Sequence, residues 1–328
     1  MKFILPTEIV SNKFYSSMEF VTQQINGIIL HHLKIEKQLL MTVCSNFGAK
    51  LTHLNFQAGG KNIPVLWELT LPEIKSGAWC KSEILFPFPN RLRDGRYEFE
   101  GTTYQFPIDE PINMNAIHGF VNNRPFEVKE MVVKDDKAKI SLQHDFLGDF
   151  KHYPFAFSLT VSFEYDLNLK SLNTSFDVVN MGDKKMPFGL GWHPYFSFNN
   201  ELIHKIKMKL PDVDLIEMDE RQLPTGNRHP YQIAQIDFAK AYMDHGFHIA
   251  DLIPKYAISD GFFKLDFEAG DKLEYLQIFN PKNDEGVAIE PMSCNVDAFN
   301  NKDGLVALES GETWSSHFAI NFSTIEQS

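Results

Sequence analysis

The sequence predicts an all-β protein that is built mainly of antiparallel sheet. Apolar and polar residues alternate over residues 157–165 and again over 169–179, and this period of two is typical of strands with one buried face. Strands of that kind belong to antiparallel sheets, because the strands of parallel sheets are usually buried on both faces. Elsewhere, short β-favouring runs are separated by Asn, Gly and Pro. Only residues 236–243 suggest a short helix.

The composition is that of a globular protein with a large core. Of the 328 residues, 43% are hydrophobic, and 29 of them are Phe. This length allows two domains, but all-β sandwiches and barrels often exceed 200 residues as one unit. The chain has no Pro/Ser/Gly-rich linker, no low-complexity tract and no short internal repeat. We therefore expect residues 1–328 to form a single β domain.

Charge and cysteine content narrow the classes of partner. The formal net charge of −12 opposes nonspecific binding to nucleic acid or to an anionic membrane, so a small polar partner fits better. The three cysteines show neither CxxC nor zinc-ligand spacing, which favours a reducing compartment. No apolar run is long enough for a membrane span, and Pro6 ends the N-terminal apolar run early. We expect a cytoplasmic protein, and the oligomeric state stays open.

The first third of the chain predicts an extended lead-in followed by hairpins. Residues 1–27 carry little periodicity, whereas residues 28–56 contain β-favouring runs broken by Asn46 and Gly48. The dipeptide Asp94-Gly95 is a hairpin signal, and the alternation that follows it predicts a half-exposed strand. Arg91 lies just ahead of this turn, where a loop side chain can reach a pocket.

The rest of the chain predicts further strands in quick succession. Residues 128–134 and 138–142 form a pair around a two-residue turn, and the alternating segments 157–179 follow. The later strands are predicted over 204–210, 213–219, 272–281, 286–291 and 314–322. The alternating segments 157–179 lead toward the stretch that contains His193, and the segment 286–291 contains Glu290.

The stretch 189–196 reads Gly-Leu-Gly-Trp-His-Pro-Tyr-Phe and combines a titratable ring with aromatic neighbours. Pro194 disfavours helical backbone at the residue before it, so His193 should sit on extended chain. Gly189 and Gly191 allow close approach of other atoms. For an isolated histidine, a turn or bulge surrounded by core aromatics is the more common explanation. Glu290 has the same arrangement, because it ends the apolar run 287–289 and precedes a proline.

A buried carboxylate at such a strand end needs a partner. Several candidate binding groups lie at strand ends or loops bordered by Pro or Gly, where binding groups collect on a rigid scaffold. They are Asn90, Arg91, His118, His193 and Glu290.

No serine-hydrolase, P-loop or dinucleotide-binding motif is present. A metal site built from two histidines and a carboxylate has no local spacing to support it, so no metal is expected.

These motifs, in this order, resemble those of the aldose 1-epimerases, which are galactose mutarotase-like proteins. The resemblance covers about residues 30–323, and its most specific element is Trp192-His193-Pro194-Tyr195-Phe196. The other motifs are Pro89-Asn90-Arg91, Phe99-x-Gly101-x-x-Tyr104, His118-Gly119, Pro224-Thr225-Gly226, Asp244-His245, Glu290-Pro291 with Asp297-Ala298-Phe299-Asn300, and Ser310-Gly311-Glu312-Thr313.

The resemblance implies a large antiparallel β-sandwich of the galactose mutarotase-like supersandwich type, with few short helices and a sugar site in a concave face. It implies interconversion of the α and β anomers of a free hexose by acid/base ring opening and reclosure. By motif, Glu290 corresponds to the general base and His193 to the general acid. Asn90, Arg91 and His118 correspond to groups that hold the sugar. Asp244 corresponds less securely to a sugar-binding carboxylate, since Asp237 lies nearby.

Ordinary pKa values of about 4.3 for Glu and about 6.5 for His suit these two roles at neutral pH. The reaction involves no redox change, so no cofactor is expected. The chain departs from the sugar mutarotase pattern at His118-Gly119-Phe120, where a second glycine is usual. This departure resembles the hexose-6-phosphate epimerases, for which Arg93, Arg96 and Arg124 could supply phosphate contacts. A carbohydrate-binding protein without catalytic activity is the other alternative.

Overall fold

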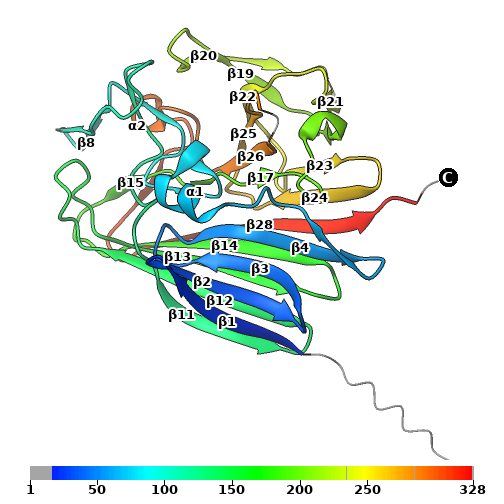
Figure 1. The fold of residues 1–328 in the computed structure, drawn as a ribbon. Helices are drawn as coiled ribbons and strands as arrows, with labels where there is room; N and C mark the ends of the chain where they lie inside the picture. The colour runs from blue at the N-terminus through cyan, green and yellow to red at the C-terminus, as the bar shows by residue number, and fades with distance from the viewer. Residues whose placement is uncertain (1–16, 234, 284, 327–328) are drawn as a thin grey trace, which may run out of the picture.

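The computed structural model describes residues 17–326 except 234 and 284, and a nine-stranded antiparallel sheet is its largest layer (Figure 1). The strand order is β11-β12-β13-β14-β28-β24-β23-β18-β21, and each neighbouring pair is antiparallel. The bounds are β11 Glu127–Lys134, β12 Lys137–Phe146, β13 Phe157–Asp166, β14 Ser171–Asn180, β18 Lys207–Lys209, β21 Gln235–Asp237, β23 Lys255–Ser259, β24 Phe263–Ala269 and β28 Thr313–Thr324.

Two further sheets complete the layers. A five-stranded sheet contains β1 Met18–Ile25, β2 Ile28–Ile35, β3 Gln38–Cys44, β4 Lys50–Ala58 and β5 Lys61–Pro64. An eight-stranded sheet contains β6 Ile84–Leu85, β16 Gly191–Trp192, β17 Tyr195–Phe196, β19 Asp214–Met218, β20 Pro224–Pro230, β22 Asp244–His248, β25 Tyr275–Phe279 and β26 Val287–Met292. The part of the predicted lead-in over residues 1–16 lies outside the described residues.

Both smaller sheets pack on the same face of the nine-stranded sheet. Phe56 of the five-stranded sheet stacks on Tyr165 of β13, at 5.5 Å between ring centroids. Trp192 of the eight-stranded sheet packs against Phe163, also on β13, at 6.2 Å. Phe163 and Tyr165 are two residues apart and therefore point to the same side of the strand. The all-β sandwich predicted from alternation is confirmed.

The remaining elements are short and lie in the connections. They are α1 Leu71–Ser76, α2 Ala298–Asn301, β7 Arg91–Arg93, β8 Arg96–Phe99, β9 Thr102–Gln105, β10 Asn115–Ile117, β15 Met186–Phe188, β27 Val306–Leu308 and two 3-10 turns at Ala78–Cys80 and Ile203–Lys205. Thr70 and Glu73 form a capping box that starts α1, and Gly77 ends it in the left-handed region. Among the described residues, no helix is long and apolar enough to cross a bilayer.

Two local predictions are wrong. Residues 236–243 do not form a helix: β21 ends at Asp237, whose carboxylate accepts the Ala239 N–H at 3.1 Å and so favours a turn. The Asp94-Gly95 turn does not join a hairpin, because β7 pairs with β10. The hairpin in this region is formed by β8 and β9, across the Glu100-Gly101 turn.

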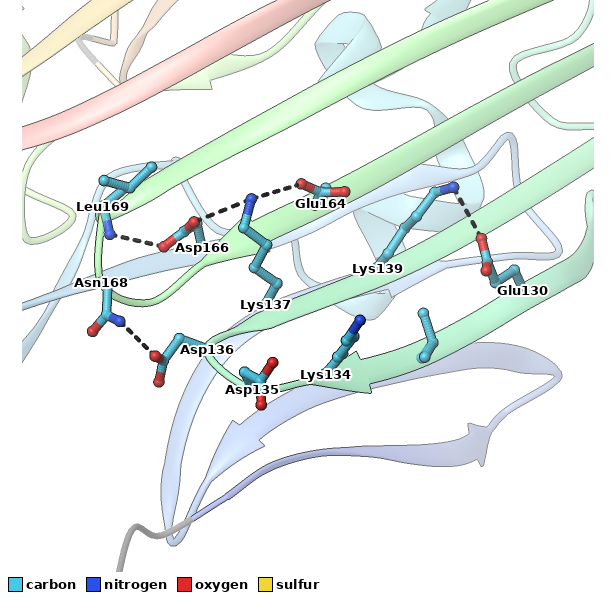
Figure 2. Close-up of a pocket in the computed structure, with 11 residues that line it drawn as sticks. Glu130, Lys134, Asp135, Asp136, Lys137, Lys139, Glu164, Asp166, Asn168 and Leu169 are labelled. Carbon is cyan, nitrogen blue, oxygen red and sulfur yellow. Dashed lines mark hydrogen bonds and ion pairs between the residues drawn. The ribbon is translucent and has the colours of Figure 1, made fainter.

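The other face of the nine-stranded sheet is polar. A hollow of about 770 Å³ lies there over β11, β12 and β13. Figure 2 shows that several of its charged side chains form ion pairs: Lys137 lies 3.5 Å from Asp166 and 3.6 Å from Glu164. Lys139 likewise pairs with Glu130 at 2.9 Å. Paired, solvent-facing charges of this kind are typical of the wet face of an antiparallel sheet.

We expect Gly119→Ala to lower the free energy of unfolding by at least ~2 kcal/mol. Gly119 has a φ of 72°, and a Cβ built there would lie 2.1 Å from the backbone oxygen of Phe86. Gly101→Ala is the matched control, because Gly101 has a φ of 75° but nothing within 4 Å of a built Cβ. Urea denaturation of both variants measures the difference. Equal stabilities would contradict the close approach at Gly119.

Candidate active site

The register of the eight-stranded sheet places Gln277, Glu290 and His193 in one row. Gln277 on β25 pairs directly with Glu290 on β26. The pairings of β16 and β17 with β26 keep a single register, which sets His193, between them, opposite Glu290. Residues directly opposite one another in an antiparallel sheet project from the same face. The three side chains therefore converge although the chain positions are far apart.

Strand alternation also explains why the row faces a cavity. Trp192 is fully buried and points toward the nine-stranded sheet, so the next residue, His193, points to the opposite face. The backbone of His193 is also held on the edge away from β26. Its N–H donates to Glu83 O at 3.0 Å, and its carbonyl accepts from Ser82 N–H at 2.8 Å. The extended backbone predicted before Pro194 is present.

His193 and Glu290 are in direct contact. His193 Nε2 lies 3.3 Å from Glu290 Oε1, and the two residues are only 6% and 2% exposed. Three polar atoms here are buried and have no hydrogen-bond partner among the described residues, namely His193 Nδ1, Glu290 Oε2 and Gln277 Oε1. Each unpartnered buried polar atom costs about 1–3 kcal/mol. Several of them side by side indicate a place built to receive a polar ligand.

Asn90 and His118 hold each other beside this row. The N–H of Asn90 donates to His118 Nδ1 at 3.1 Å, and the N–H of His118 donates to Asn90 O at 2.9 Å. Because Nδ1 accepts a hydrogen bond, the neutral ring carries its proton on Nε2 and can donate it to a ligand. The His118 ring meets the His193 ring edge-on, at 5.4 Å between centroids.

Arg91 is clamped by an acidic residue, Glu110. The guanidinium Nε lies 2.9 and 3.0 Å from the two Glu110 oxygens, and Nη2 lies 2.8 Å from Oε1. Glu110 in turn accepts from the side-chain amides of Asn113 at 2.9 Å and Asn115 at 3.2 Å. Arg91 Nη1 donates to Asn90 Oδ1 at 3.2 Å. This bidentate arrangement fixes the direction of the only cation that lines the cavity among the described residues.

Asp244, rather than Asp237, belongs to the site. Asp244 begins β22, lines the cavity and accepts a hydrogen bond from Gln277 Nε2 at 2.9 Å. Asp237 lies on β21, at the edge of the nine-stranded sheet, where it pairs with Lys240 at 3.6 Å.

The cavity that these side chains share has a volume of about 240 Å³. It is lined by Trp79, Cys80, Asn90, Arg91, Ile117, His118, His193, Tyr195, Asp244, Gln277, Phe279 and Glu290. All six residues singled out from the sequence are in this set. The volume is below the usual range for drug-sized ligands, about 300–1,000 Å³, and suits a single small polar molecule.

The sequence matches the family model described as Aldose 1-epimerase over residues 31–321. The chain belongs to the aldose 1-epimerase family. It is therefore an isomerase of the epimerase type, as the sequence motifs predicted.

Relatives and solved structures agree with membership of the aldose 1-epimerase family. The chain is 30% identical to the uncharacterized protein YihR of Escherichia coli K12, over 81% of this chain and 84% of YihR. It is 24% identical to the bifunctional protein GAL10 of Kluyveromyces lactis, over 73% of this chain but only 39% of GAL10. A galactose mutarotase-like protein from Clostridium acetobutylicum has the same fold, with a TM-score of 0.83, 22% identity and coverage of 94% and 99%. The galactose 1-epimerase of Lactobacillus acidophilus superposes with a TM-score of 0.77, 16% identity and coverage of 94% and 98%.

Burial shifts the pKa values of three titratable side chains that line the cavity. Desolvation lowers the pKa of His193 to about 3. Desolvation also raises the pKa of Glu290 well above its ordinary value, with the charge of Asp244 adding to the rise and that of Arg91 opposing it. The pKa of His118 is lowered by burial and by the charges of His193 and Arg91. Burial thus disfavours the charged form of both groups, and so disfavours the ion pair that ordinary pKa values suggest.

Sequence reasoning missed Glu110 and Gln277. Gln277 follows the alternation of a buried strand, and its only distinguishing mark is a polar side chain on the otherwise apolar run 275–279. Glu110 lies in a loop between Pro107 and Pro111, where a carboxylate is ordinary. Neither residue could be assigned without its spatial partner.

We expect Glu110→Gln to raise the KM for the substrate by about 10-fold while kcat falls less. The amide cannot provide the charged, bidentate acceptor that orients Arg91, and hydrogen bonds to charged groups contribute about 1.5–3 kcal/mol. Glu98→Gln is the control, because Glu98 is exposed on β8. Steady-state kinetics of both variants make the comparison, and an unchanged KM in Glu110→Gln would contradict a positioning role.

We also expect His193→Asn to reduce the loss of stability on acidification. Because the pKa of His193 is about 3 in the folded protein and that of an unfolded imidazole is about 6.5, the unfolded chain binds more protons between these values. The free energy of unfolding therefore falls as the pH falls through this window. Glu290 acts in the opposite sense, because its raised pKa gives stability at low pH that is lost as the pH rises.

Removing His193 should make the loss between pH 7 and pH 5 smaller by ~1–2 kcal/mol. Urea denaturation at the two pH values measures it, with the exposed His204 replaced by Asn as control. Parallel curves for wild type and His193→Asn would contradict a neutral, buried imidazole.

Proposed function

We propose that the chain interconverts the α and β anomers of a free, unphosphorylated aldose by opening and reclosing its hemiacetal ring. The observation that carries this proposal is the 3.3 Å contact between His193 Nε2 and Glu290 Oε1 in the wall of the 240 Å³ cavity. Ring opening removes a proton from the C1 hydroxyl and delivers a proton to the ring oxygen. An adjacent carboxyl group and imidazole can carry out both transfers on one small molecule.

Glu290 acts as the general base and His193 as the general acid. Glu290 takes the C1 hydroxyl proton as the bond from C1 to the ring oxygen breaks, and His193 protonates that oxygen. Rotation about the C1–C2 bond then presents the other face of the aldehyde. The same transfers in reverse close the ring and restore both groups.

The neutral pair and the ion pair contain the same number of protons. A single transfer from Glu290 to His193, across their contact, converts one into the other without exchange with water. Sugar hydroxyls and Arg91 stabilise the charged form when the substrate binds. Ring opening returns the pair to the neutral form, which is the form that burial favours. Burial thus stabilises the protonation state that accompanies the open-chain aldehyde.

The remaining polar residues hold the sugar. Arg91 and the Nε2–H of His118 donate to sugar oxygens, while Asp244 and Gln277 offer acceptors at the Gln277 end of the row. Groups fixed by hydrogen bonds before the substrate arrives need little reorganisation, which favours catalysis by positioning. The described residues include no group of three His, Cys, Asp or Glu arranged to hold a metal ion.

The charge of the cavity supports a neutral sugar over a sugar phosphate. Arg91, the only cation lining it among the described residues, is already paired with Glu110. Arg93 lies near Asp219 and Asp297, and Arg124 lies over the ring of Phe120 at 5.8 Å. Neither these two residues nor Arg96, which is exposed on β8, line the cavity. A dianionic phosphate would face Glu290 and Asp244 with one compensated arginine.

We also infer that the chain works as one domain. One apolar core contains residues from Met18 to Phe322, and elements from both halves of the chain supply the site.

We expect Glu290→Gln and His193→Asn each to lower kcat by about 10²- to 10⁴-fold, the range for loss of one acid or base group. NMR exchange spectroscopy or polarimetry of freshly dissolved α-glucose and α-galactose measures the rate. Circular dichroism checks that the variants remain folded.

Glucose 6-phosphate in the same assay distinguishes the phosphate alternative, and faster exchange of the phosphate than of every free aldose would contradict the proposal. Wild-type rates equal to those in buffer for all these sugars would exclude catalysis. Calorimetric binding without exchange would then identify a carbohydrate-binding protein.

A further inference from the structure

Asp297 is only 6% exposed, although it does not line the 240 Å³ cavity. It begins the motif Asp297-Ala298-Phe299-Asn300, seven residues after Glu290 along the chain. Its backbone is left-handed, with a φ of 59° and a ψ of 26°. Asp and Asn adopt this region more readily than most other residues with a side chain. A buried carboxyl group in such a conformation needs partners that hold it.

Two hydrogen bonds join Asp297 to β7, the strand that begins with Arg91. The Asp297 N–H donates to Arg91 O at 2.9 Å, and its Oδ1 accepts from the Arg93 N–H at 2.9 Å. The other edge of β7 is occupied, because it pairs with β10. Asn90, one residue before Arg91, directs its own backbone groups to His118 on that second edge. Asp297 therefore takes the place of a neighbouring strand, with a carboxylate oxygen as one of its two hydrogen-bonding groups.

The Asp297 carboxylate is itself held in place. Asn300 Nδ2 donates to the same Oδ1 at 2.7 Å, and Arg93 Nε lies 3.6 Å from Oδ2. The carboxylate does not cap α2, because it makes no hydrogen bond to a backbone N–H of that helix. Phe299 of α2 instead packs edge-on against Tyr97 of β8, at 4.7 Å between ring centroids. The backbone group that the carboxylate binds thus belongs to β7.

These contacts connect two charged parts of the site. Glu290 is on β26, and the chain after β26 is fixed by the Ser293 N–H, which donates to Leu190 O at 2.8 Å. Asp297 then reaches β7 from this segment and holds the residue that carries the guanidinium. The placement of Arg91 matters for the acid/base pair, since its positive charge opposes the rise that burial causes in the pKa of Glu290.

We propose that Asp297 is a positioning residue, which sets Arg91 at its working distance from Glu290 and His193. This inference rests on the proposed function, because it concerns the placement of a cation that holds the sugar beside the acid/base pair. Asp297 acts through the backbone of β7, whereas Glu110 acts through the Arg91 side chain. The two acidic residues therefore control different degrees of freedom. Asp297 fixes where the arginine starts, and Glu110 fixes where its guanidinium points.

Steady-state anomer exchange of a free aldose by wild type and three variants tests this role. Asp297→Gly removes the carboxylate but keeps the N–H and a residue that adopts left-handed backbone without strain. We expect its KM to rise about fivefold while kcat falls less than about twofold, the size of one lost hydrogen bond. Asp297→Asn keeps a neutral oxygen acceptor and should raise KM about twofold. Asp166→Asn is the matched control, because Asp166 is 7% exposed and accepts the Leu169 N–H at 2.8 Å, but lies on β13 of the nine-stranded sheet.

The pH profile of kcat/KM separates positioning from a purely structural role. A positive charge near Glu290 and His193 favours loss of their protons, so displacement of Arg91 should move the profile to higher pH. Deleting the negative charge of Asp297 has the opposite direct effect, because it makes the surroundings of the pair more positive. A shift to higher pH in Asp297→Gly therefore identifies an effect that acts through Arg91. Asp166→Asn should change neither the profile nor KM.

An unchanged KM and an unchanged pH profile in a folded Asp297→Gly would overturn the proposal, and so would equal rises of KM in Asp297→Gly and Asp166→Asn. Circular dichroism shows whether Asp297→Gly folds, and if it does not, the same two measurements on Asp297→Asn decide. If wild type exchanges no aldose, the proposed function fails, and NMR titration of the Glu290 carboxyl carbon decides the positioning separately. A higher pKa of Glu290 in Asp297→Gly than in wild type would support it, and an equal or lower pKa would overturn it.

Discussion

The contact between Glu290 and His193 is made where neither group can readily carry a charge alone. Burial disfavours the charged form of both groups, the carboxylate and the imidazolium. It therefore raises the pKa of Glu290 and lowers the pKa of His193. Because the two groups touch, one internal proton transfer still reaches the charged pair. If the carboxylate and the histidine were instead solvated and apart, each would have to exchange its proton with water separately. The proximity therefore makes burial compatible with acid/base chemistry.

The backbone rather than the side chains sets this proximity. The register of β25, β26 and the β16–β17 segment fixes Gln277, Glu290 and His193 opposite one another, and Glu83 extends the row through its hydrogen bond with His193 N–H. The Glu83 side chain is itself buried and lies 3.1 Å from the fully buried Lys50. Removing one partner of a buried ion pair is strongly destabilising. The strand that carries the imidazole is thus held on both sides, by the sheet and by this pair.

The sequence was informative where local chain geometry decides the outcome. Alternation predicted the strands because a period of two is a local property, and the proline after His193 predicted extended backbone there. The resemblance to a known family added the roles proposed for Glu290 and His193, which no local pattern contains. The helix expected at 236–243 failed because the Asp237 side chain competes for the backbone N–H groups. The Asp94-Gly95 signal predicted a turn, but the pairing of its flanking strands is decided by more distant partners.

Glu110 and Gln277 could not be found in that way, because their importance comes from what they contact across the fold. Their positions also divide the site into two parts. The acid/base row and Gln277 are carried by paired strands, whereas Asn90 and His118 lie in the connections beside it, and Glu110 clamps Arg91 from a connection. Strands in a packed sheet change position only together, while connecting segments can change one at a time. In the proposed mechanism, proton transfer is therefore tied to the rigid part of the fold, and recognition of the sugar is tied to the part in which substitutions are more easily accommodated. The polar clamp from Glu110 through Asn115 to Arg221 Nη2, which lies 3.2 Å from Asn115 Oδ1, keeps that second part in place.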